Sequence, residues 1–492
     1  MTTPYGSDPG TALRATDPAG GPSAVALRAT DPAGGPSAVA LRATDPARWL
    51  EAASAWRFWA VAAGSWAADV RSCAARLRSV WTGSAAEALA ARLGRLVRRL
   101  DLFRLECWAA DQALSEFAAS LTRAGPADDL AAASTADRRA TEQLQALFLT
   151  EASPPASPSP SCTASPAEVG RWWAGLGPEH REWLLVTEPG TIGSLDGVPA
   201  AARDRANRLL LDQLPRGGAA LVALRDRLAG GDGPRAYLMA LDPGGDGRAV
   251  VALGDPDRAE VLLTHVPGMT ADLASFGGEL DRAERVAVRA GELAPGRAAS
   301  AVMWLGYDAP DFLGEASSRA RAEAGAPALR RFQDGLRVTH EGRPARQTVL
   351  GHSYGSLVVG TAAARAGFAA DSVVFVGSPG VGVDSAGGLH VPSGEVWAST
   401  SRTDVIQWAA VSPRSLAEDL LTSQIRPAGA VLAFSRPEND LYYGTNPADP
   451  AFGARTFPSQ PDAGHLGYWD EGGPALDALT NITLGRTDVI PR

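Results

Sequence analysis

Residues 347–360 read QTVLGHSYGSLVVG, a short apolar strand that runs through a G-x-S-x-G motif into a stretch of small and apolar residues typical of a helix. Gly351 and Gly355 let the backbone turn sharply, which holds the hydroxyl of Ser353 clear of its own main chain. Because 53 of the 492 residues are glycine, the motif also arises by chance. The order of the surrounding elements therefore decides its meaning.

Strand-like segments alternate with helical ones on both sides of this motif. The predicted strands are residues 236–241, 249–253, 260–266, 301–305, 348–351, 372–376 and 396–399, with a last one near 454–457. The sequence PGGDG at 243–247 predicts a hairpin between the first two strands. This order predicts an α/β fold, with a mostly parallel sheet and helices on both faces, and it is the strand order of an α/β-hydrolase.

The same order predicts a catalytic triad. In this fold the serine follows the fifth strand, an acid follows a later strand and the base histidine comes last. Of the six histidines only His465 lies beyond the late acids, so it is the expected base. Asp404, after the strand at 396–399, is the expected acid that fixes the imidazole tautomer. Asp384, after the preceding strand, is the alternative acid, and either aspartate also suits a helix cap.

Two main-chain N–H groups are expected to form the oxyanion hole. One belongs to Tyr354, directly after the serine, and the other to the loop after the third strand, which reads HVPGMT at 265–270. Gly268 permits close backbone approach, so the N–H of Met269 is the best candidate there. His352 precedes the serine, and its side chain is expected to point away and to pack.

The N-terminal part has another character. ALRATDPAGGPSAV at 12–25 recurs unchanged at 26–39, and a truncated third copy begins at Ala40. Each copy holds turn signals and too few apolar residues to bury a face, so residues 1–48 are predicted to be a disordered tail.

A heptad pattern from Trp49 onward predicts two antiparallel helices that turn near Gly83, with a capping box at Ser84 and Glu87. The expected seam of the first helix is Trp49, Trp56, Ala63, Val70 and Leu77 with Ala52, Trp59, Trp66, Cys73 and Val80. That of the second is Leu93, Leu100, Cys107, Leu114 and Leu121 with Leu89, Leu96, Phe103, Ala110 and Phe117.

This predicted hairpin, residues 49–125, resembles WXG100-type helical hairpins. Its seam is expected to bind a protein partner, a second copy of the chain or the chain's own catalytic unit. Residues 126–150 predict a short helix, and PPASPSPSCTASP at 154–166 is a linker that cannot form a core. The domain boundary therefore falls within 126–167, and residues 168–492 form the catalytic domain. Its helical start, around 172–213, is a candidate cap over an apolar acyl pocket.

Composition excludes several classes of protein. The formal net charge of −9 and the lack of an evident basic patch argue against a nucleic-acid partner. The first ten residues lack the blocks of a secretory signal, and no apolar run is long enough to span a bilayer, so a cytoplasmic location is expected. Export by the WXG route stays an alternative, although no Tyr lies between Tyr5 and Tyr237 to supply that family's signal. Three cysteines make no disulfide framework, and neither a metal nor a cofactor is indicated.

Several C-terminal stretches together resemble the actinobacterial DUF1023 α/β-hydrolases, from about Trp172 to the end of the chain. These are IGSLDGVP at 192–199, residues 203–207, VPG at 266–268, GYDAP at 306–310, GHSYG at 351–355, residues 377–384 and GH at 464–465 closing on YWD at 468–470. The resemblance implies the fold and a Ser/His/Asp triad, but it names no substrate. We therefore expect a serine hydrolase acting on an acyl ester, with peptidase and thioesterase chemistry open. The second hypothesis is a catalytically idle interaction or secretion-associated protein that acts through its hairpin.

Overall fold

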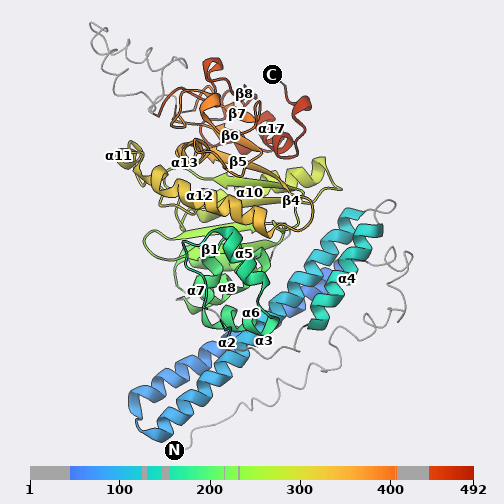
Figure 1. Cartoon of the computed structure of the whole chain (residues 1–492), viewed down its shortest axis with the longest axis vertical. Helices are drawn as coiled ribbons and strands as arrows, with labels where there is room; N and C mark the ends of the chain where they lie inside the picture. The colour runs from blue at the N-terminus through green and yellow to red at the C-terminus, as the bar shows by residue number, and fades with distance from the viewer. Residues whose placement is uncertain are drawn as a thin grey trace, which may run out of the picture.

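A computed structural model describes residues 45–124, 130–146, 154–156, 158–214, 217–230, 233–404, 406 and 443–491. One eight-stranded sheet in the order β1-β2-β4-β3-β5-β6-β7-β8 organises the C-terminal half (Figure 1). Its strands are β1 Ala236–Asp242, β2 Arg248–Leu253, β3 Val261–Val266, β4 Ala299–Trp304, β5 Arg346–His352, β6 Ser372–Val376, β7 Val396–Ser399 and β8 Arg455–Thr456. All eight predicted strands are present, with ends that shift by a few residues.

The sheet is antiparallel only at its first edge. β1 pairs with β2 and β2 with β4 in antiparallel register, whereas every pairing from β4 through β3 to β8 is parallel. Parallel strands that are covered on both faces need continuous apolar sequence, and β3 and β6 are buried at every position. The carboxyl ends of β3, β5, β6 and β7 consequently open on one edge of the sheet.

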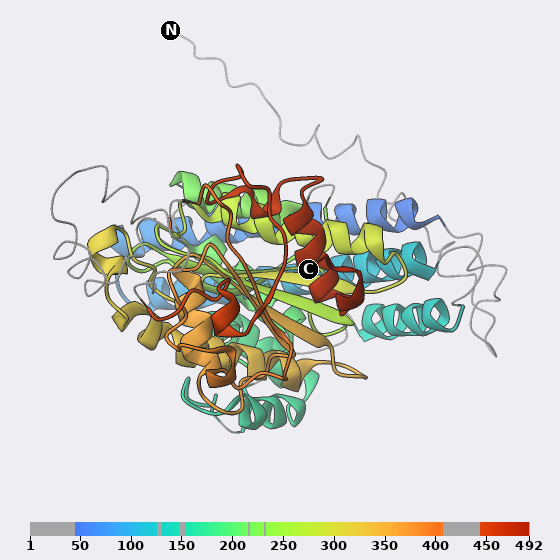
Figure 2. The same ribbon diagram turned by 90° about the horizontal axis from the view of Figure 1, so that it is seen from above.

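Helices cover both faces of the sheet (Figure 2). α10 (Phe276–Leu293) and α17 (Pro474–Thr483) pack together on one face, and α12 (Ala320–Thr339) and α13 (Gly355–Ala363) pack together on the other. The apolar stripe of α10 shows the helical period, since Leu280, Ala283, Ala287 and Ala290 are all buried. This three-layer arrangement confirms the predicted α/β-hydrolase fold.

The helices α5 (Pro166–Ala174), α6 (Pro178–Thr187), α7 (Pro189–Ser194) and α8 (Ala200–Gln213) lie at the β1 end of the sheet (Figure 1). α8 is fixed there by Asn207, whose amide donates to the carbonyls of Gly193 and Leu238 at 3.0 and 2.9 Å. A Cβ on Gly193 would lie 2.1 Å from Asn207, so this glycine is sterically required. The segment predicted as a cap thus packs on β1, while Ser353 follows β5, farther along the sheet.

Two long helices precede this unit, α2 (Pro46–Val80) and α3 (Ser84–Ala124), and they pack side by side as a hairpin. The chain reverses at Gly83, where φ is +104°. A shorter helix, α4 (Leu130–Ala146), packs against α3. Most of the predicted tail lies outside the described residues, and the described part of the predicted linker holds no helix or strand before Pro166.

The seam of α2 differs from the predicted one. The buried side chains are Ala53, Ala60, Ala63 and Ala67, whereas Trp59, Trp66 and Val80 are 47%, 48% and 81% exposed, and Cys73 is exposed. Small residues let two helices approach closely, so alanines form much of the contact. Of the predicted seam, Trp49, Trp56 and Ala63 do pack inward, with Trp49 edge-on against Phe117 at 5.1 Å, whereas Trp59 and Trp66 face outward. Ser84 is already the first residue of α3, and the capping box forms instead at Ser165 and Glu168, ahead of α5.

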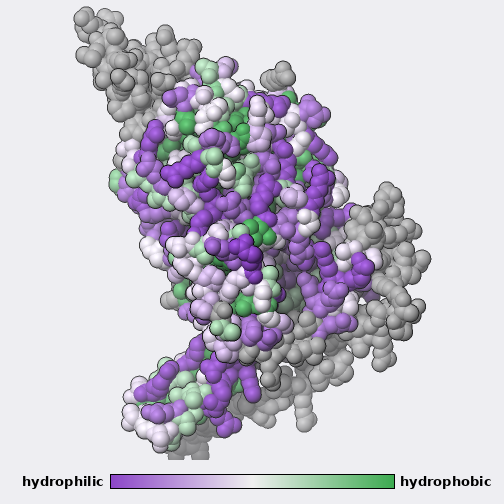
Figure 3. Space-filling model, viewed as in Figure 1, coloured by the Kyte–Doolittle hydropathy of each residue, from purple (hydrophilic) through white to green (hydrophobic). Residues whose placement is uncertain are grey.

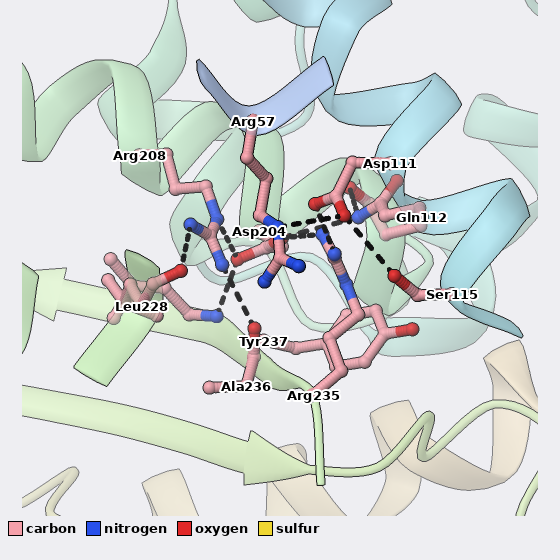
Figure 4. A network of polar contacts seen from close by, with 12 residues as sticks. Arg57, Asp111, Gln112, Ser115, Asp204, Arg208, Leu228, Arg235, Ala236 and Tyr237 are labelled. Atoms are coloured by element: carbon pink, nitrogen blue, oxygen red, sulfur yellow. Dashed lines mark hydrogen bonds and ion pairs between the residues drawn. The ribbon is translucent and has the colours of Figure 1, made fainter. Parts of the chain in front are cut away.

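The hairpin joins the sheet through buried charges (Figure 4). Asp111 of α3, only 1% exposed, pairs with Arg57 of α2 at 3.3 Å and with Arg235 beside β1. Asp204 of α8, fully buried, accepts hydrogen bonds from Gln112 of α3 at 3.2 Å and from the main chain of Leu238 at 2.8 Å. Burying these groups is costly unless they are paired, so these contacts hold the hairpin in a fixed position against the sheet.

Candidate active site

The turn between β5 and α13 is strained at the predicted serine. Ser353 has φ +53°, in the left-handed region that non-glycine residues rarely adopt. The two motif glycines are required by their surroundings: a Cβ on Gly351 would lie 2.6 Å from the main chain of Ser356, and one on Gly355 would lie 2.2 Å from the carbonyl of Val266. Any side chain larger than hydrogen would clash at these two positions, which explains why both are glycine in the G-x-S-x-G motif. The close backbone contacts accompany the sharp turn at Ser353.

His465 and Asp404 lie together at the same edge of the sheet. Nδ1 of His465 donates to Oδ1 of Asp404 at 2.7 Å; the aspartate is fully buried and the histidine side chain is 22% exposed. A buried carboxylate that holds Nδ1–H leaves Nε2 as the imidazole nitrogen available to a substrate or nucleophile. Within the described residues, no hydrogen bond joins Ser353 Oγ to His465 or to another group.

Hydrogen bonds join the loop that carries Asp404 to the loop that carries His465. Thr403 donates from its main chain and from Oγ1 to the carbonyl of Pro461, at 3.2 and 3.1 Å, and its Oγ1 accepts from the N–H of Gly464 at 3.1 Å. Ser401 Oγ also reaches the Pro461 carbonyl at 3.2 Å. Two segments some sixty residues apart are therefore held in a fixed relation, which explains how the pair keeps its geometry on loops.

The second carboxylate oxygen of Asp404 is also occupied. Tyr468 OH donates to Oδ2 at 2.6 Å and accepts from the N–H of Ser401 at 2.9 Å, while the N–H of Ile406 donates to Oδ1 at 2.9 Å. Burial, followed by the charge of Asp404, raises the pKa of the Tyr468 hydroxyl, so it stays protonated and acts as a donor. The acid is thus oriented by three donors, counting His465.

Gly377, which follows β6, links the serine turn to this pair. The N–H of Ser353 donates to the carbonyl of Val376 at 3.1 Å, and the next residue, Gly377, has φ +55°. A Cβ there would lie 2.7 Å from Asp404 Oδ2 and 3.0 Å from both Nδ1 and Cε1 of His465. Asp404 and His465 therefore rest against the backbone that neighbours the serine.

The loop after β3 approaches the serine closely. A Cβ on Gly268 would lie 2.6 Å from Ser353 Cβ and 3.1 Å from its Oγ. The hydroxyl of Tyr307 donates to the carbonyl of Pro267 at 2.7 Å, and the N–H of Thr270 donates to the carbonyl of Pro310 at 2.8 Å, so the GYDAP segment holds this loop from both ends. In the described part of the chain, the N–H groups of Met269 and Tyr354 have no hydrogen-bond acceptor.

A layer of further side chains packs behind His465 and Asp404, and sequence analysis predicted no role in the site for them. His352 Nε2 donates to the carbonyl of His465 at 3.0 Å, and their rings are 4.6 Å apart. Burial, and next the proximity of His465, lowers the pKa of His352 well below its usual value, so this ring is neutral. Trp469 packs edge-on against the rings of His352 and His265, at 5.1 and 5.3 Å. The packing predicted for His352 is thus directed at the main chain of His465.

His265, fully buried at the end of β3, forms a second histidine–carboxylate pair with Glu279 of α10 at 3.0 Å. Burial alone raises the pKa of Glu279, but the hydrogen bond and charge of His265, with the charge of Arg282, outweigh it and lower the pKa to about 2. The sequence alone does not reveal this pair. His265 lies on a strand and Glu279 on a helix, and the two side chains meet only because α10 packs on the sheet.

The alternative acid, Asp384, lies elsewhere. Its side chain is exposed and its Oδ1 faces Gly444, where a Cβ would approach it to 2.9 Å. Among the described residues only Asp404 contacts the His465 ring as an acid. No group of three or more His, Cys, Asp or Glu side chains suited to a metal ion occurs in the part of the chain that the structure describes.

The sheet order and the residues gathered at its carboxyl edge define an α/β-hydrolase. A sequence-family profile described as alpha/beta hydrolase matches residues 242–413, a span that contains the serine turn and Asp404. The uncharacterized protein Rv0963c of Mycobacterium tuberculosis and its counterpart Mb0988c of Mycobacterium bovis are 35% identical over 187 residues, which cover 36% of this chain and 69% of each relative. The chain therefore belongs to the α/β-hydrolase family that includes these mycobacterial proteins.

A longer relative matches more of the chain. The uncharacterized protein Rv2079 of Mycobacterium tuberculosis is 32% identical over 387 residues, which cover 67% of this chain and 57% of that protein. The chain thus spans little more than half the length of this relative. The solved structure of an N-formylmaleamic acid deformylase from Pseudomonas putida, all of which aligns with 50% of this chain, shares 12% identity at a TM-score of 0.23, too low a value to support an argument.

Proposed function

We propose that this protein is a serine hydrolase in which Ser353 is the nucleophile, His465 the general base and Asp404 the orienting acid. The observation that carries the proposal is the 2.7 Å hydrogen bond between His465 Nδ1 and Asp404 Oδ1, beside a serine held in a left-handed turn. A buried acid, a partly exposed imidazole and a strained serine at one sheet edge are the parts that acyl transfer needs.

The chemistry follows from these positions. His465 Nε2 takes the proton of Ser353 as Oγ attacks the acyl carbonyl, and Asp404 stabilises the imidazolium that forms. The imidazolium then gives this proton to the leaving oxygen, which departs as an alcohol and leaves the acyl group on the serine. Water, deprotonated by the same nitrogen, attacks the acyl-enzyme, and the proton returns to Ser353 as the carboxylic acid leaves.

The oxyanion is stabilised by the N–H groups of Tyr354 and Met269. Both lack an acceptor among the described residues, and preorganised N–H donors in a site that excludes water stabilise developing charge strongly. The approach of Gly268 to the serine supports the assignment, because it brings the neighbouring N–H to the face of the turn where Oγ lies.

An acyl ester is the proposed substrate. An alkoxide leaves a tetrahedral intermediate more readily than an amide nitrogen does, so an ester makes a smaller demand on this triad than a peptide bond does. Peptide and thioester bonds would use the same residues. The motifs that resemble the DUF1023 family support the same triad, and the N-terminal hairpin is proposed to be of the WXG100 kind.

A fluorophosphonate probe followed by a panel of p-nitrophenyl esters of increasing chain length tests the proposal. Wild-type protein is expected to be labelled and to hydrolyse at least one ester, whereas Ser353→Ala does neither. Ser356→Ala, a neighbouring buried serine that bonds the Gly351 carbonyl, is the matched control and should keep its label. Failure of folded wild-type protein to react with the probe would contradict the proposal.

A second candidate function is interaction with a protein through α2. Trp59 and Trp66, seven residues apart, are about half exposed, which is unusual for such large apolar side chains. This role requires no active serine. It gains support if the folded wild type stays unlabelled and the Trp59→Ala/Trp66→Ala variant loses a protein partner or self-association that the wild type has.

A further inference from the structure

The far end of the hairpin projects from the rest of the molecule (Figure 1). We call residues 71–100 the arm: the last ten residues of α2, the turn at Gly83 and the first seventeen residues of α3. Near the base of the arm, Asp101 pairs with Arg71 at 3.3 Å and with Arg104. A helix rises about 1.5 Å per residue, so the ten residues of α2 carry the tip roughly 15 Å outward.

The arm is strongly basic although the whole chain has a formal charge of −9. It contains seven arginines and one glutamate, a net charge of +6; these arginines are Arg71, Arg76, Arg78, Arg92, Arg95, Arg98 and Arg99. All but Arg71 are exposed. The basic patch that the sequence did not reveal exists because two arginine-rich stretches from opposite sides of the turn come together on one hairpin.

These arginines are not balanced by acids. Outside the arm, arginines such as Arg203, Arg258 and Arg346 pair with carboxylates at 2.6–3.3 Å. Six arginines of the arm, all except Arg71, have no carboxylate partner in the part of the chain that the structure describes. Their only described side-chain hydrogen bonds are local, as from Arg76 to Ser72 and from Arg78 to the carbonyl of Ala74.

Apolar side chains lie among the charges. At the tip Val80 is 81% exposed and Trp81 is 44% exposed, and Leu96, on the same helix as Arg92 and Arg99, is 44% exposed. Figure 3 shows the arm at the lower left as hydrophilic side chains interleaved with hydrophobic ones. In a monomer in water a large part of each of these apolar side chains stays in contact with solvent, so the arm has the composition of a contact surface.

We propose that the arm docks the protein on an anionic lipid surface. Arginines attract lipid phosphates and keep their charged heads at the level of the headgroups, while an exposed tryptophan and valine enter the acyl boundary. The Debye length is about 8 Å at physiological ionic strength, and an arm of about 15 Å holds the acidic body beyond that distance. No described helix is long and apolar enough to cross a bilayer, so the protein would lie on the surface.

Nucleic acid fits the arm less well. Phosphates along a duplex would satisfy the arginines, but aliphatic Val80 and Leu96 gain little from a phosphate backbone. Insertion of the tip into lipid uses both the charges and the apolar side chains. The proposal is independent of the proposed catalysis, since none of the arm's residues belongs to the serine site.

Sedimentation of the full chain with vesicles of phosphatidylcholine and phosphatidylglycerol tests the proposal. Wild type should bind these vesicles, bind pure phosphatidylcholine much more weakly and lose binding as salt rises. Arg92→Gln/Arg99→Gln should weaken binding about thirtyfold, from roughly one kilocalorie per mole for each arginine. Val80→Ser/Trp81→Ser should weaken it at least tenfold with its salt dependence kept.

The matched control is Arg343→Gln/Arg365→Gln, which removes the same charge from exposed positions on the body. Equal weakening by this control, or no vesicle binding by wild type, overturns the proposal. Tighter binding to a duplex DNA oligonucleotide than to the anionic vesicles at the same salt also overturns it, in favour of nucleic acid. Fluorophosphonate labelling of each variant in solution should equal that of wild type, which separates this result from the outcome for catalysis.

Discussion

Substitution of Gly377 by alanine should uncouple the acid and base from the serine. The added Cβ would lie 2.7 Å from Asp404 Oδ2 and 3.0 Å from His465 Nδ1 and Cε1, closer than van der Waals contact allows. Asp404 is fully buried and bonded on both oxygens, so it has little room to retreat. The partly exposed imidazole is therefore expected to move.

Two effects set the magnitude. The left-handed backbone, with φ +55°, costs an alanine about 1–2 kcal/mol of stability relative to glycine. A displacement of the imidazole by about 1 Å is expected to lower the rate of serine acylation by roughly a hundredfold. The assay is the second-order rate constant for fluorophosphonate labelling, read together with the free energy of unfolding from urea denaturation.

Gly394→Ala is the matched control. Gly394 also has a positive φ, +78°, but a Cβ there meets no atom within 4 Å, so it reproduces the backbone strain without the contact. The control should lose about 1–2 kcal/mol of stability and keep the labelling rate of wild type. Equal labelling rates in the two variants would refute the geometric link between Gly377 and the acid–base pair.

Three further predictions concern the surroundings of the site and the hairpin. Tyr468→Phe removes a donor from the buried acid, so it should cost about 1.5–3 kcal/mol in urea unfolding and slow labelling; unchanged stability and labelling would contradict its role in holding Asp404. Asp111→Ala leaves Arg235 buried without its closest partner and should lower the free energy of unfolding of the full chain by about 3–5 kcal/mol; a loss under 1 kcal/mol would mean the hairpin is not coupled to the sheet. The depressed pKa of Glu279, about 2 against an ordinary 4.5, gives stability that is fully present above pH 4.5 and is lost as the pH falls toward 2. Glu279→Gln should therefore be less stable than wild type by roughly 3 kcal/mol at pH 6 and equally stable near pH 2, and a gap that does not narrow with acid would contradict the pairing with His265.

The sequence predicted the sheet well because its signals are local. Short apolar runs bounded by turn residues recur at seven of the eight strands, with β8 (Arg455–Thr456) as the exception, and the serine turn needs only two glycines at fixed spacing. The order of the chemistry follows from the order of the strands, which is why Asp404 and His465 emerge as candidates before any coordinates.

Local signals could not locate what depends on distance in space. The heptad of α2 offers two apolar stripes, and the pattern alone does not say that the alanines of the narrower stripe meet α3 while Trp59 and Trp66 face outward. In the same way, the pairing of His265 with Glu279 and the clustering of arginines on the arm arise only when separate segments pack.

The most direct test of the proposed triad is to identify the residue that a fluorophosphonate modifies. After reaction with a fluorophosphonate, trypsin should release the modified peptide 347–365, with the adduct on Ser353, from wild type and from Gly394→Ala. The peptide should stay unmodified in His465→Ala treated for the same time, because the base that activates the serine is missing. An adduct on another residue, or equal labelling without the imidazole, would contradict the triad.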